Sequence, residues 1–450
     1  MSIKNTSLTV DEIDEIFKRS NKIFFIGIGG VSLSSLAKFC VIKNKAVFGY
    51  DSKRNELSAR LEDCCHIKYC SSPDSVCGMD LVIFTTAISE DNLEYKKAKA
   101  LKIPLVSRAN FLGYIMTKYR NRIGITGTHG KSTATSILGH IFKYAGKNPT
   151  VFCGGKMLNY DSCELIGGND YCIFEGCEYL NAFLSFKPTE SIITNIDYDH
   201  PDFFKSINDV VSSFQKYASL NKKIYINSDD TLSSRIRHEN TVSYGIHSRA
   251  DYMAKISHSP RKNGFSVYKN DELLVECELS FVGEHFVYDA LSAFCVAYEN
   301  GISKETIKNA LSCFKGTERR LELIKKTGTG VDIFQDYAHH PTEIKSSLSA
   351  LIDMGYKRIA CVFQAHTYSR TYYLYENFKN VLRCVDNLII VPTFSAREEN
   401  TFDFTDESFA LDCGGVFISD YEKISDYVSK LDVDAIVIMG AGDLAKKLKL

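Results

Sequence analysis

The ten residues GITGTHGKST, at positions 124–133, are the first stretch of the sequence whose residue types could do chemistry. Gly127 and Gly130 allow backbone N–H groups to turn toward an anion, because no Cβ stands in the way. Lys131 adds a positive charge for the β- and γ-phosphates of a nucleotide, and the Ser132 hydroxyl can hold Mg²⁺. These residues predict a nucleotide phosphate site rather than a plain glycine turn closed by a solvated lysine.

The loop is shorter than the common phosphate-binding pattern G-x-x-x-x-G-K-[ST]. Ile125 stands five positions before Gly130, whereas Gly127 stands only three positions before it. The apolar run RIGIT comes before the loop, and apolar residues at helical spacing follow it at 137–142. This order of strand, glycine turn and helix suits phosphate, because the first turn of a helix offers free N–H donors.

Acidic side chains follow two further strand-like runs, in FEGCEYLNAFL and TNIDYDHPDFF. Ligands gather at the carboxyl ends of parallel strands, so we expect Glu175 and His200 to join Ser132 around a metal ion that bridges phosphate oxygens. Mg²⁺ prefers oxygen ligands, so a histidine in the set makes Mn²⁺ the alternative ion. Glu178 and Asp202, by contrast, are expected to be surface charges or helix caps.

A third group of polar residues lies in QDYAHHPTEI and FQAHTYSRTYY. Asp336 ends a strand-like run and suits a nucleotide hydroxyl or a reacting amine, and Arg370 offers a planar fork for a carboxylate. Tyr337 and His339 add polar groups near the same strand ends. One of the two adjacent histidines is expected to cap a helix that starts at Pro341.

Strand-like and helix-like runs alternate along the chain, which predicts an α/β fold of parallel sheets with crossover helices. The expected units are a Rossmann-like N-terminal domain (1–118), a central P-loop ATPase-type α/β domain with a small added β-sheet (119–317), and a Rossmann-like C-terminal domain (318–450). Arg319 and Arg320 fall at the joint between the second and third units. An arginine there is expected to reach the γ-phosphate when the third unit closes.

A second glycine cluster, GIGG, opens the N-terminal unit, and Asp51 ends the next strand-like run. Gly27, Gly29 and Asp51 resemble the dinucleotide fingerprint G-x-G-x-x-G with its acidic residue, but Ser32 replaces the third glycine. The partial match leaves two interpretations open. The cluster is either a site for a phosphorylated ligand, NAD among them, or a tight turn between a strand and a helix.

Composition limits the partners of the chain. It has 450 residues, of which 44% are hydrophobic and 24% charged, and a net charge of −1, so neither nucleic acid nor a membrane surface is indicated. The polar N-terminus lacks the apolar core of a signal peptide, and no apolar run approaches a membrane span, so a cytoplasmic protein is expected. The 15 cysteines show no C-x-x-C spacing, which favours small buried thiols over disulfides or zinc sites.

Seven motifs occur in one order along the chain: GITGTHGKST, FEGCEY, TNIDYDH, GEHFVYDALSAF, FKGTERRLELI, DYAHHPTEI and FQAHTYSRT. Together with GIGGVSLSSLA near the start, they resemble the Mur ligase family over nearly all of residues 22–445, including the shorter loop G-T-x-G-K-[ST]-[ST]. The resemblance implies an ATP-dependent enzyme of peptidoglycan precursor synthesis. It would join L-alanine to the lactyl carboxylate of UDP-N-acetylmuramate through an acyl phosphate, release ADP and phosphate, and work as a monomer or homodimer.

The resemblance also implies roles for individual residues. Catalysis falls to Lys131, Glu175, His200, Arg320 and His339. ATP binding falls to Gly127, Thr128, His129, Gly130, Lys131, Ser132, Thr133, His285, Asp289, Arg320 and Asp336. The residues implied to bind the nucleotide sugar are Gly27, Gly29, Gly30, Asp51 and Thr86. Those implied to bind the amino acid are Tyr337, His339 and Arg370, and those implied to bind Mg²⁺ (or Mn²⁺) are Ser132, Glu175 and His200.

The sequence departs from the family pattern at Phe286 and Asp289, where the pattern has asparagine in the part of the site that contacts adenine. We therefore expect these contacts to be weakened or replaced. Pro201 removes a backbone donor beside the metal histidine. The alternatives are a related ligase that adds a peptide to the same nucleotide sugar, a nucleotide-binding paralogue without turnover, and a nicotinamide-dependent dehydrogenase.

Overall fold

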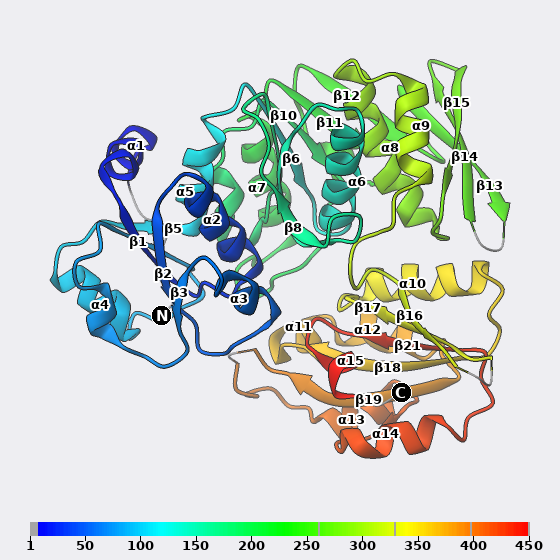
Figure 1. The fold of residues 1–450 in the computed structure, drawn as a ribbon. Helices are drawn as coiled ribbons and strands as arrows, with labels where there is room; N and C mark the ends of the chain where they lie inside the picture. Colours follow the sequence, from blue (N-terminus) through cyan, green and yellow to red (C-terminus); the bar gives the residue numbers. More distant parts are fainter. Residues whose placement is uncertain (1–7, 260–261, 328–329, 397, 449–450) are drawn as a thin grey trace.

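The computed structural model describes residues 8–259, 262–327, 330–396 and 398–448. It contains three sheets, each formed by its own part of the chain (Figure 1). Parallel strand pairs with helices against them make up most of each sheet, so the predicted α/β class is confirmed. The central sheet lies between the other two along the sequence and contacts both, so it holds the molecule together.

The N-terminal unit is a five-stranded parallel sheet in the order β3-β2-β1-β4-β5. Its central strand β1 reads KIFFI and is buried after its first residue, as expected for a parallel strand covered on both faces. The predicted strands β1, β2, β4 and β5 are all present, and the short β3 was not predicted. The elements are α1 (Val10–Arg19), β1 (Lys22–Ile26), α2 (Val31–Ile42), β2 (Ala46–Tyr50), α3 (Glu56–Leu61), β3 (His66–Lys68), η1 (Pro73–Val76), β4 (Leu81–Phe84), α4 (Leu93–Ala100), β5 (Leu105–Ser107) and α5 (Arg108–Met116).

The central unit is a ten-stranded sheet in the order β15-β14-β13-β12-β11-β10-β6-β9-β7-β8. Strand β6 pairs in parallel with β10 and β9, so the loops after these three strands meet at one edge. The elements are β6 (Asn121–Thr126), α6 (Lys131–Tyr144), β7 (Thr150–Met157), β8 (Ser162–Leu165), β9 (Tyr171–Glu175), η2 (Tyr179–Ser185), β10 (Glu190–Ile193), α7 (Ile207–Ala218), β11 (Lys223–Asn227), η3 (Ser233–Arg235), β12 (Thr241–Gly245), β13 (Tyr252–Ser259), β14 (Lys262–Lys269), β15 (Glu272–Leu279), α8 (Glu284–Glu299) and α9 (Lys304–Ser312).

The added strands β13, β14 and β15 extend the main sheet, because β13 pairs with β12. They form an antiparallel meander, with buried and exposed residues alternating along β15, which packs on α9. The turn predicted at 261–264 begins outside the described residues.

The C-terminal unit is a six-stranded sheet in the order β16-β17-β21-β18-β19-β20, parallel except for β16. Strand β16 is mostly exposed and forms one edge, and it was not predicted. The elements are β16 (Glu322–Lys326), β17 (Asp332–Asp336), α10 (Pro341–Asp353), β18 (Ile359–His366), α11 (Tyr368–Tyr373), α12 (Tyr375–Leu382), β19 (Asn387–Phe394), α13 (Asp406–Asp412), β20 (Val416–Phe417), α14 (Tyr421–Val428), β21 (Ala435–Met439) and α15 (Leu444–Lys447).

Apolar cores are shared between the units. One cluster of buried side chains joins Phe111 of α5 to Phe183 and Phe214 of the central unit. The two units approach each other closely at Gly113, where an added Cβ would lie 2.3 Å from the carbonyl oxygen of Ser185. A second cluster runs from α6 and α8 across to α10 and β18 of the C-terminal unit.

Two expectations from composition can be compared with the structure. Within the described residues, no helix is long and apolar enough to cross a membrane. All 15 cysteines are free thiols, as expected, although five of them are exposed rather than buried.

Candidate active site

The phosphate loop has the predicted arrangement of strand, turn and helix. Strand β6 ends at Thr126, and α6 starts at Lys131 with Gly130 as its N-cap and no side chain capping it. Gly127 and Gly130 both have positive φ, at 140° and 82°. An added Cβ would lie 1.9 Å from Thr194 Oγ1 at the first glycine and 2.5 Å from Asp289 Oδ1 at the second, so both positions require glycine.

Asn195 fixes the shape of the loop from the neighbouring strand β10. Its carbonyl oxygen accepts from Thr128 N–H at 3.0 Å, and its side-chain Oδ1 accepts from His129 N–H at 2.8 Å. The sequence reasoning missed this residue, and its only signal was a position just past a strand end. The loop is therefore held in shape by protein contacts before any ligand binds.

Lys131 is held inside the loop by a buried partner. Its Nζ donates to the carbonyl oxygens of Gly127 and Thr128 at 2.6 and 2.9 Å, and pairs with Glu178 Oε2 at 3.0 Å. Burial lowers the pKa of Lys131, but the Glu178 carboxylate outweighs this and raises it above its usual value. The prediction of Glu178 as surface charge or helix cap was wrong, because Glu178 is only 2% exposed and serves as the counter-ion of the loop lysine. Asp202 is exposed, as predicted.

Ser132 and Glu175 come together as predicted for a metal site. Ser132 Oγ donates to Glu175 Oε2 at 2.8 Å, and Gly154 N–H donates to the same oxygen at 2.7 Å. A side chain at Gly154 would collide with this carboxylate, since an added Cβ would lie 2.4 Å from it. The hydroxyl and carboxylate oxygens form a donor set that suits Mg²⁺.

His200, predicted to complete this metal site, contacts other groups instead. Its Nε2 is 3.8 Å from Glu178 Oε1 and 3.8 Å from Asp199 Oδ2, and its ring packs on Tyr179 with centroids 4.6 Å apart. Its φ is 55°, a left-handed conformation next to Pro201. The structure thus places Glu178 between Lys131 and His200, whereas Ser132 contacts Glu175.

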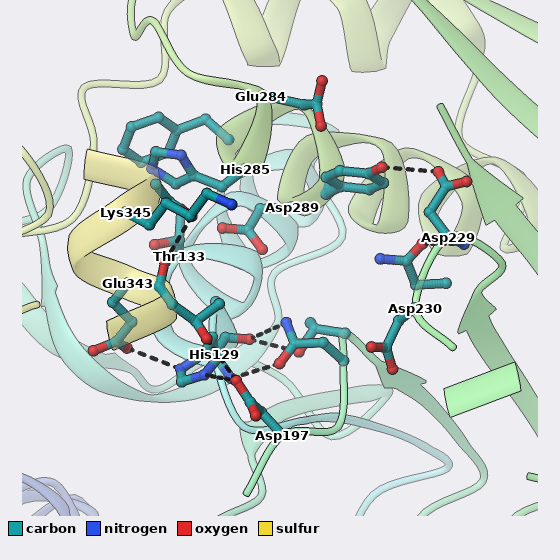
Figure 2. A pocket seen from close by; sticks show the side chains of 18 of the residues that line it. His129, Thr133, Asp197, Asp229, Asp230, Glu284, His285, Asp289, Glu343 and Lys345 are labelled. Atoms are coloured by element: carbon teal, nitrogen blue, oxygen red, sulfur yellow. Dashed lines mark hydrogen bonds and ion pairs between the residues drawn. The ribbon is translucent and has the colours of Figure 1, made fainter. Parts of the chain in front are cut away.

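A cavity of about 1040 Å³ opens between the phosphate loop and α10 (Figure 2). Seven of the residues predicted to bind ATP line it: His129, Gly130, Thr133, His285, Asp289, Arg320 and Asp336. It is also lined by residues that sequence reasoning missed, including Asp229 and Asp230 after β11 and Lys345 on α10. The run KKIYINSDD was recognised as a strand, but its terminal acids gave no separate signal.

The far wall of the cavity carries the two departures from the family pattern. The Phe286 ring stacks near the His285 ring with centroids 4.1 Å apart, and both side chains line the cavity. Burial lowers the pKa of His285 to about 4 and raises the pKa of the Asp289 carboxyl. The His285 ring is therefore uncharged at neutral pH, and burial disfavours the charged form of Asp289, so this wall offers a ring surface beside a buried carboxyl.

Asp336 ends β17 at the cavity and is almost fully buried. Its carboxyl accepts from Ser347 Oγ at 2.5 Å and from Ala338 N–H at 3.0 Å. Burial raises the pKa of Asp336 to about 6.

A pH dependence of stability follows from Asp336. Its folded pKa of about 6 lies above the unfolded value near 3.9, so its contribution is present below about pH 4 and is lost as pH rises through 6. Asp336→Asn cannot ionise, so the thermal midpoint of the wild type should fall relative to this variant between pH 4 and 7. The difference corresponds to at most about 3 kcal/mol. Parallel curves in a calorimetric pH series would contradict this assignment.

The two adjacent histidines have different roles. His340 is the N-cap of α10 and accepts from Thr342 N–H at 3.3 Å, which confirms that one histidine caps the helix starting at Pro341. His339 lies against the carbonyl oxygen of Tyr337 at 2.9 Å and Glu343 at 3.3 Å. Burial lowers the pKa of His339 to about 3, so it is uncharged at neutral pH.

The two arginines between the central and C-terminal units have different surroundings. Arg319 has φ 59° and donates to the carbonyl oxygen of Gly440, so it is anchored in the C-terminal sheet. Arg320 points toward the cavity, 3.9 Å from Glu343 Oε1 and over the Tyr337 ring at 5.0 Å. Arg320 is therefore the arginine of the pair that lines the cavity, and its contact with a γ-phosphate stays a prediction.

The Arg370 guanidinium forms a bidentate pair with a carboxylate of the protein itself. Its Nε and Nη2 donate to the two oxygens of Asp199 at 2.8 and 3.2 Å, and its Nη1 is 2.7 Å from His366 Nδ1. Both Arg370 and Asp199 are buried, and the pair joins α11 of the C-terminal unit to the loop after β10. An external carboxylate must therefore displace or share Asp199.

The N-terminal glycine cluster forms a turn at the carboxyl end of β1. Gly29 N–H donates to Asp51 Oδ2 at 2.8 Å, and Gly30 caps α2, so Asp51 orders the turn whether or not a ligand is bound. Thr86 follows β4 at the same edge and is partly buried. Arg108 was not predicted. Its Nη1 donates to Ser32 Oγ at 3.3 Å, which places a cation beside the first turn of α2.

Comparison with protein-family models gives three matches. The Mur ligase family catalytic domain matches residues 22–120, the Mur ligase middle domain matches 125–297, and the Mur ligase glutamate ligase domain matches 319–442. Together these ranges cover most of the chain.

Curated relatives match nearly the whole chain. The UDP-N-acetylmuramate–L-alanine ligase of Caldanaerobacter subterraneus subsp. tengcongensis is 38% identical over 96% of this chain and 97% of its own length. That of Clostridium acetobutylicum is 40% identical over 95% and 96%. The crystal structure of UDP-N-acetylmuramate-alanine ligase from Thermotoga maritima superposes with a TM-score of 0.82 at 25% identity, covering 95% of this chain and 97% of that one.

Proposed function

The chain belongs to the Mur ligase family, and from this premise we propose that it is an ATP-dependent ligase of peptidoglycan precursor synthesis. It joins L-alanine to the lactyl carboxylate of UDP-N-acetylmuramate, the reaction named for relatives 36–40% identical along nearly the full chain. One observation of the structure carries the proposal. The phosphate loop of the central unit and Arg320 of the following segment line the same cavity of about 1040 Å³.

Lys131 of the phosphate loop and Arg320 at the cavity supply the positive charges that phosphoryl transfer needs. The lactyl carboxylate attacks the γ-phosphorus of ATP, the bond to the β-phosphate oxygen breaks, and ADP leaves with an acyl phosphate formed. Lys131 and Arg320 neutralise charge on the transferring group. The amine of L-alanine then attacks the acyl carbon, and phosphate leaves as the amide forms.

Ser132 and Glu175 are the residues that would hold Mg²⁺, with Mn²⁺ as the alternative, whereas His200 contacts Glu178 and Asp199 and would have to turn toward the ion to bind it. Their contacting oxygen atoms are hard donors, which fits either ion. A bound divalent ion shields phosphate charge.

The remaining roles follow from position. Tyr337, His339 and Arg370 lie at the carboxyl edge of the C-terminal sheet and are proposed to bind the amino acid, with uncharged His339 beside its amine. The turn at 27–30, with Asp51 and Thr86, is proposed to bind the nucleotide sugar. We also propose the domain boundaries 1–118, 119–317 and 318–450, small-molecule substrates alone, and a place in the cytoplasm.

The test is phosphate release from ATP and Mg²⁺ by the purified protein. Release should require UDP-N-acetylmuramate and L-alanine together, with glycine, L-serine and a cell-wall tripeptide as competing acceptors. Release that needs the tripeptide would assign a peptide-adding ligase instead. Nucleotide binding without release under any condition would contradict the proposal and direct attention to Phe286 and Asp289.

Glu175→Gln is expected to raise the Mg²⁺ concentration for half-maximal activity by at least about tenfold, because it replaces an anionic ligand with a neutral one. The matched control is Asp170→Asn, an exposed residue just before the same strand, which should leave the Mg²⁺ requirement unchanged. The measurement is a Mg²⁺ titration at saturating substrates. An unshifted curve for Glu175→Gln would remove this carboxylate from the metal site.

A further inference from the structure

Three side chains from separate segments converge at the boundary between the central and C-terminal units. His129 belongs to the phosphate loop, Asp197 follows β10, and His340 caps α10. We propose that His129, Asp197 and His340 form a binding site for a divalent transition-metal ion of the zinc type, distinct from the Mg²⁺ site at Ser132 and Glu175. The proposal does not depend on the ligase activity.

The distances suit a tetrahedral ion. His129 Nε2 is 3.2 Å from Asp197 Oδ2, and His340 Nδ1 is 3.7 Å from the same oxygen. One ligand atom from each residue lies within 4.8 Å of the others. With metal–ligand bonds of about 2.0–2.1 Å, neighbouring ligands of a tetrahedral zinc ion lie about 3.3 Å apart. A small inward adjustment of His340 would complete this spacing.

Each histidine also has an acceptor at its other ring nitrogen. His129 Nδ1 lies 3.3 Å from Glu343 Oε1, and His340 Nε2 lies 3.2 Å from the carbonyl oxygen of Tyr198. Asp197 Oδ2 accepts from Thr342 Oγ1 at 2.6 Å. Metal-binding histidines usually donate this second N–H to a carboxylate or carbonyl, which fixes the ring and its tautomer. Both imidazoles are thus already oriented as ligands.

With His129 Nδ1–H donating to Glu343, the approach of His129 Nε2 to Asp197 Oδ2 at 3.2 Å favours a cation between these two atoms. With the outer N–H of each ring donating outward, His129 Nε2 and His340 Nδ1 present lone pairs toward a carboxylate oxygen. A proton fills this role in the free protein. Burial lowers the pKa of His129, but hydrogen bonds to Asp197 and Glu343 outweigh it and raise it to about 9. A metal ion would replace that proton, and also compete with the long 3.3 Å bond from Thr342 N–H to His340 Nδ1.

The position of the site gives it a role. His129 and Asp197 line the cavity, and Figure 2 shows His129 between Asp197 and Glu343. The side chain of His340 is 4% exposed, that of His129 12% and that of Asp197 35%. Solvent therefore reaches the site from the side of the Asp197 carboxylate. Three protein ligands leave a fourth position for water or a phosphate oxygen. A bound ion would tie the phosphate loop directly to α10 and so hold the two units together.

The experiment is equilibrium binding of Zn²⁺, and of Co²⁺ by its visible absorption, to the full chain without nucleotide. His340→Asn keeps a side chain that caps helices well, and Asp197→Asn keeps the size of its residue. Each should raise the Zn²⁺ Kd at least tenfold and remove the tetrahedral Co²⁺ bands. His66→Gln, exposed on the N-terminal unit, is the matched control, and Glu175→Gln should retain binding.

Unchanged Zn²⁺ affinity in both folded variants would overturn the proposal, as would loss of binding in Glu175→Gln alone. A second measurement uses only the wild type, in case the variants do not fold. Calorimetry at pH 7.5 in two buffers of different ionisation enthalpy should show about one proton released per Zn²⁺ bound, from His129. Binding without proton release would also refute the site.

Discussion

Lys131→Ala is expected to lower the rate of phosphate release by a factor of at least about 10³, since the loop loses the lysine proposed to neutralise charge on the transferring group. The Nζ of Lys131 now lies 2.6 Å from the Gly127 carbonyl oxygen and 3.0 Å from Glu178. An arriving γ-phosphate would draw the lysine from these partners. The measurement is the rate at saturating ATP, nucleotide sugar and L-alanine.

This substitution also disturbs stability, because it leaves Glu178 buried without its counter-ion, at a cost of about 3–5 kcal/mol. The double variant Lys131→Ala/Glu178→Gln should therefore recover much of the thermal midpoint without recovering turnover. Lys143→Ala, on the exposed face of the same helix, is the matched control for helix α6. More than a tenth of wild-type turnover in Lys131→Ala would exclude the proposed role.

Arg370→Ala is expected to raise the KM for L-alanine by about ten- to a hundredfold, the loss of a charge-assisted hydrogen bond worth about 1.5–3 kcal/mol. The KM for ATP should change less, since Arg370 does not line the nucleotide cavity. Initial rates with varied L-alanine measure the effect. An unchanged KM for L-alanine would remove Arg370 from the amino-acid site.

The existing pair with Asp199 makes a second variant informative. If the carboxylate of L-alanine must displace Asp199 from the Arg370 guanidinium, Asp199→Asn weakens this competing pair. The variant should then not raise the KM for L-alanine. Arg358→Ala is the control, because its guanidinium pairs with Asp434 on the exposed surface of the same unit. A KM raised equally by Arg370→Ala and Asp199→Asn would show that only the buried pair matters.

The sequence was sufficient for the parts of the fold and site that depend on local order. The apolar runs of the three sheets predicted most of the parallel strands, because buried parallel strands are continuous in hydrophobicity. The phosphate loop could be predicted from its glycines and Lys131, because their roles depend on residues only a few positions away. Ser132 and Glu175 lie together because β6 and β9 are neighbours, which strand-end reasoning anticipates.

The partners of charged groups could not be predicted, because they come from distant segments. Nothing in the sequence pairs Glu178 with Lys131 or Asp199 with Arg370, and the latter residues are 171 positions apart. Asp229 and Lys345 line the cavity only because β11 and α10 meet across it. Short edge strands such as β3 and β16 also escape pattern reasoning, since they carry little buried apolar surface.

The apolar cluster that joins α5 to the central unit has a consequence for how the chain is made. A ribosome completes α5 at Met116, but Phe183 and Phe214, which belong to the same buried cluster, lie much further along the chain. At translation rates of about 5–20 residues per second, the part of α5 that packs against the central unit waits several seconds for its partners. The N-terminal sheet can form as it emerges, yet it reaches its final packing only after the central sheet has been synthesised. We therefore expect nascent chains stalled between these points to be prone to aggregation.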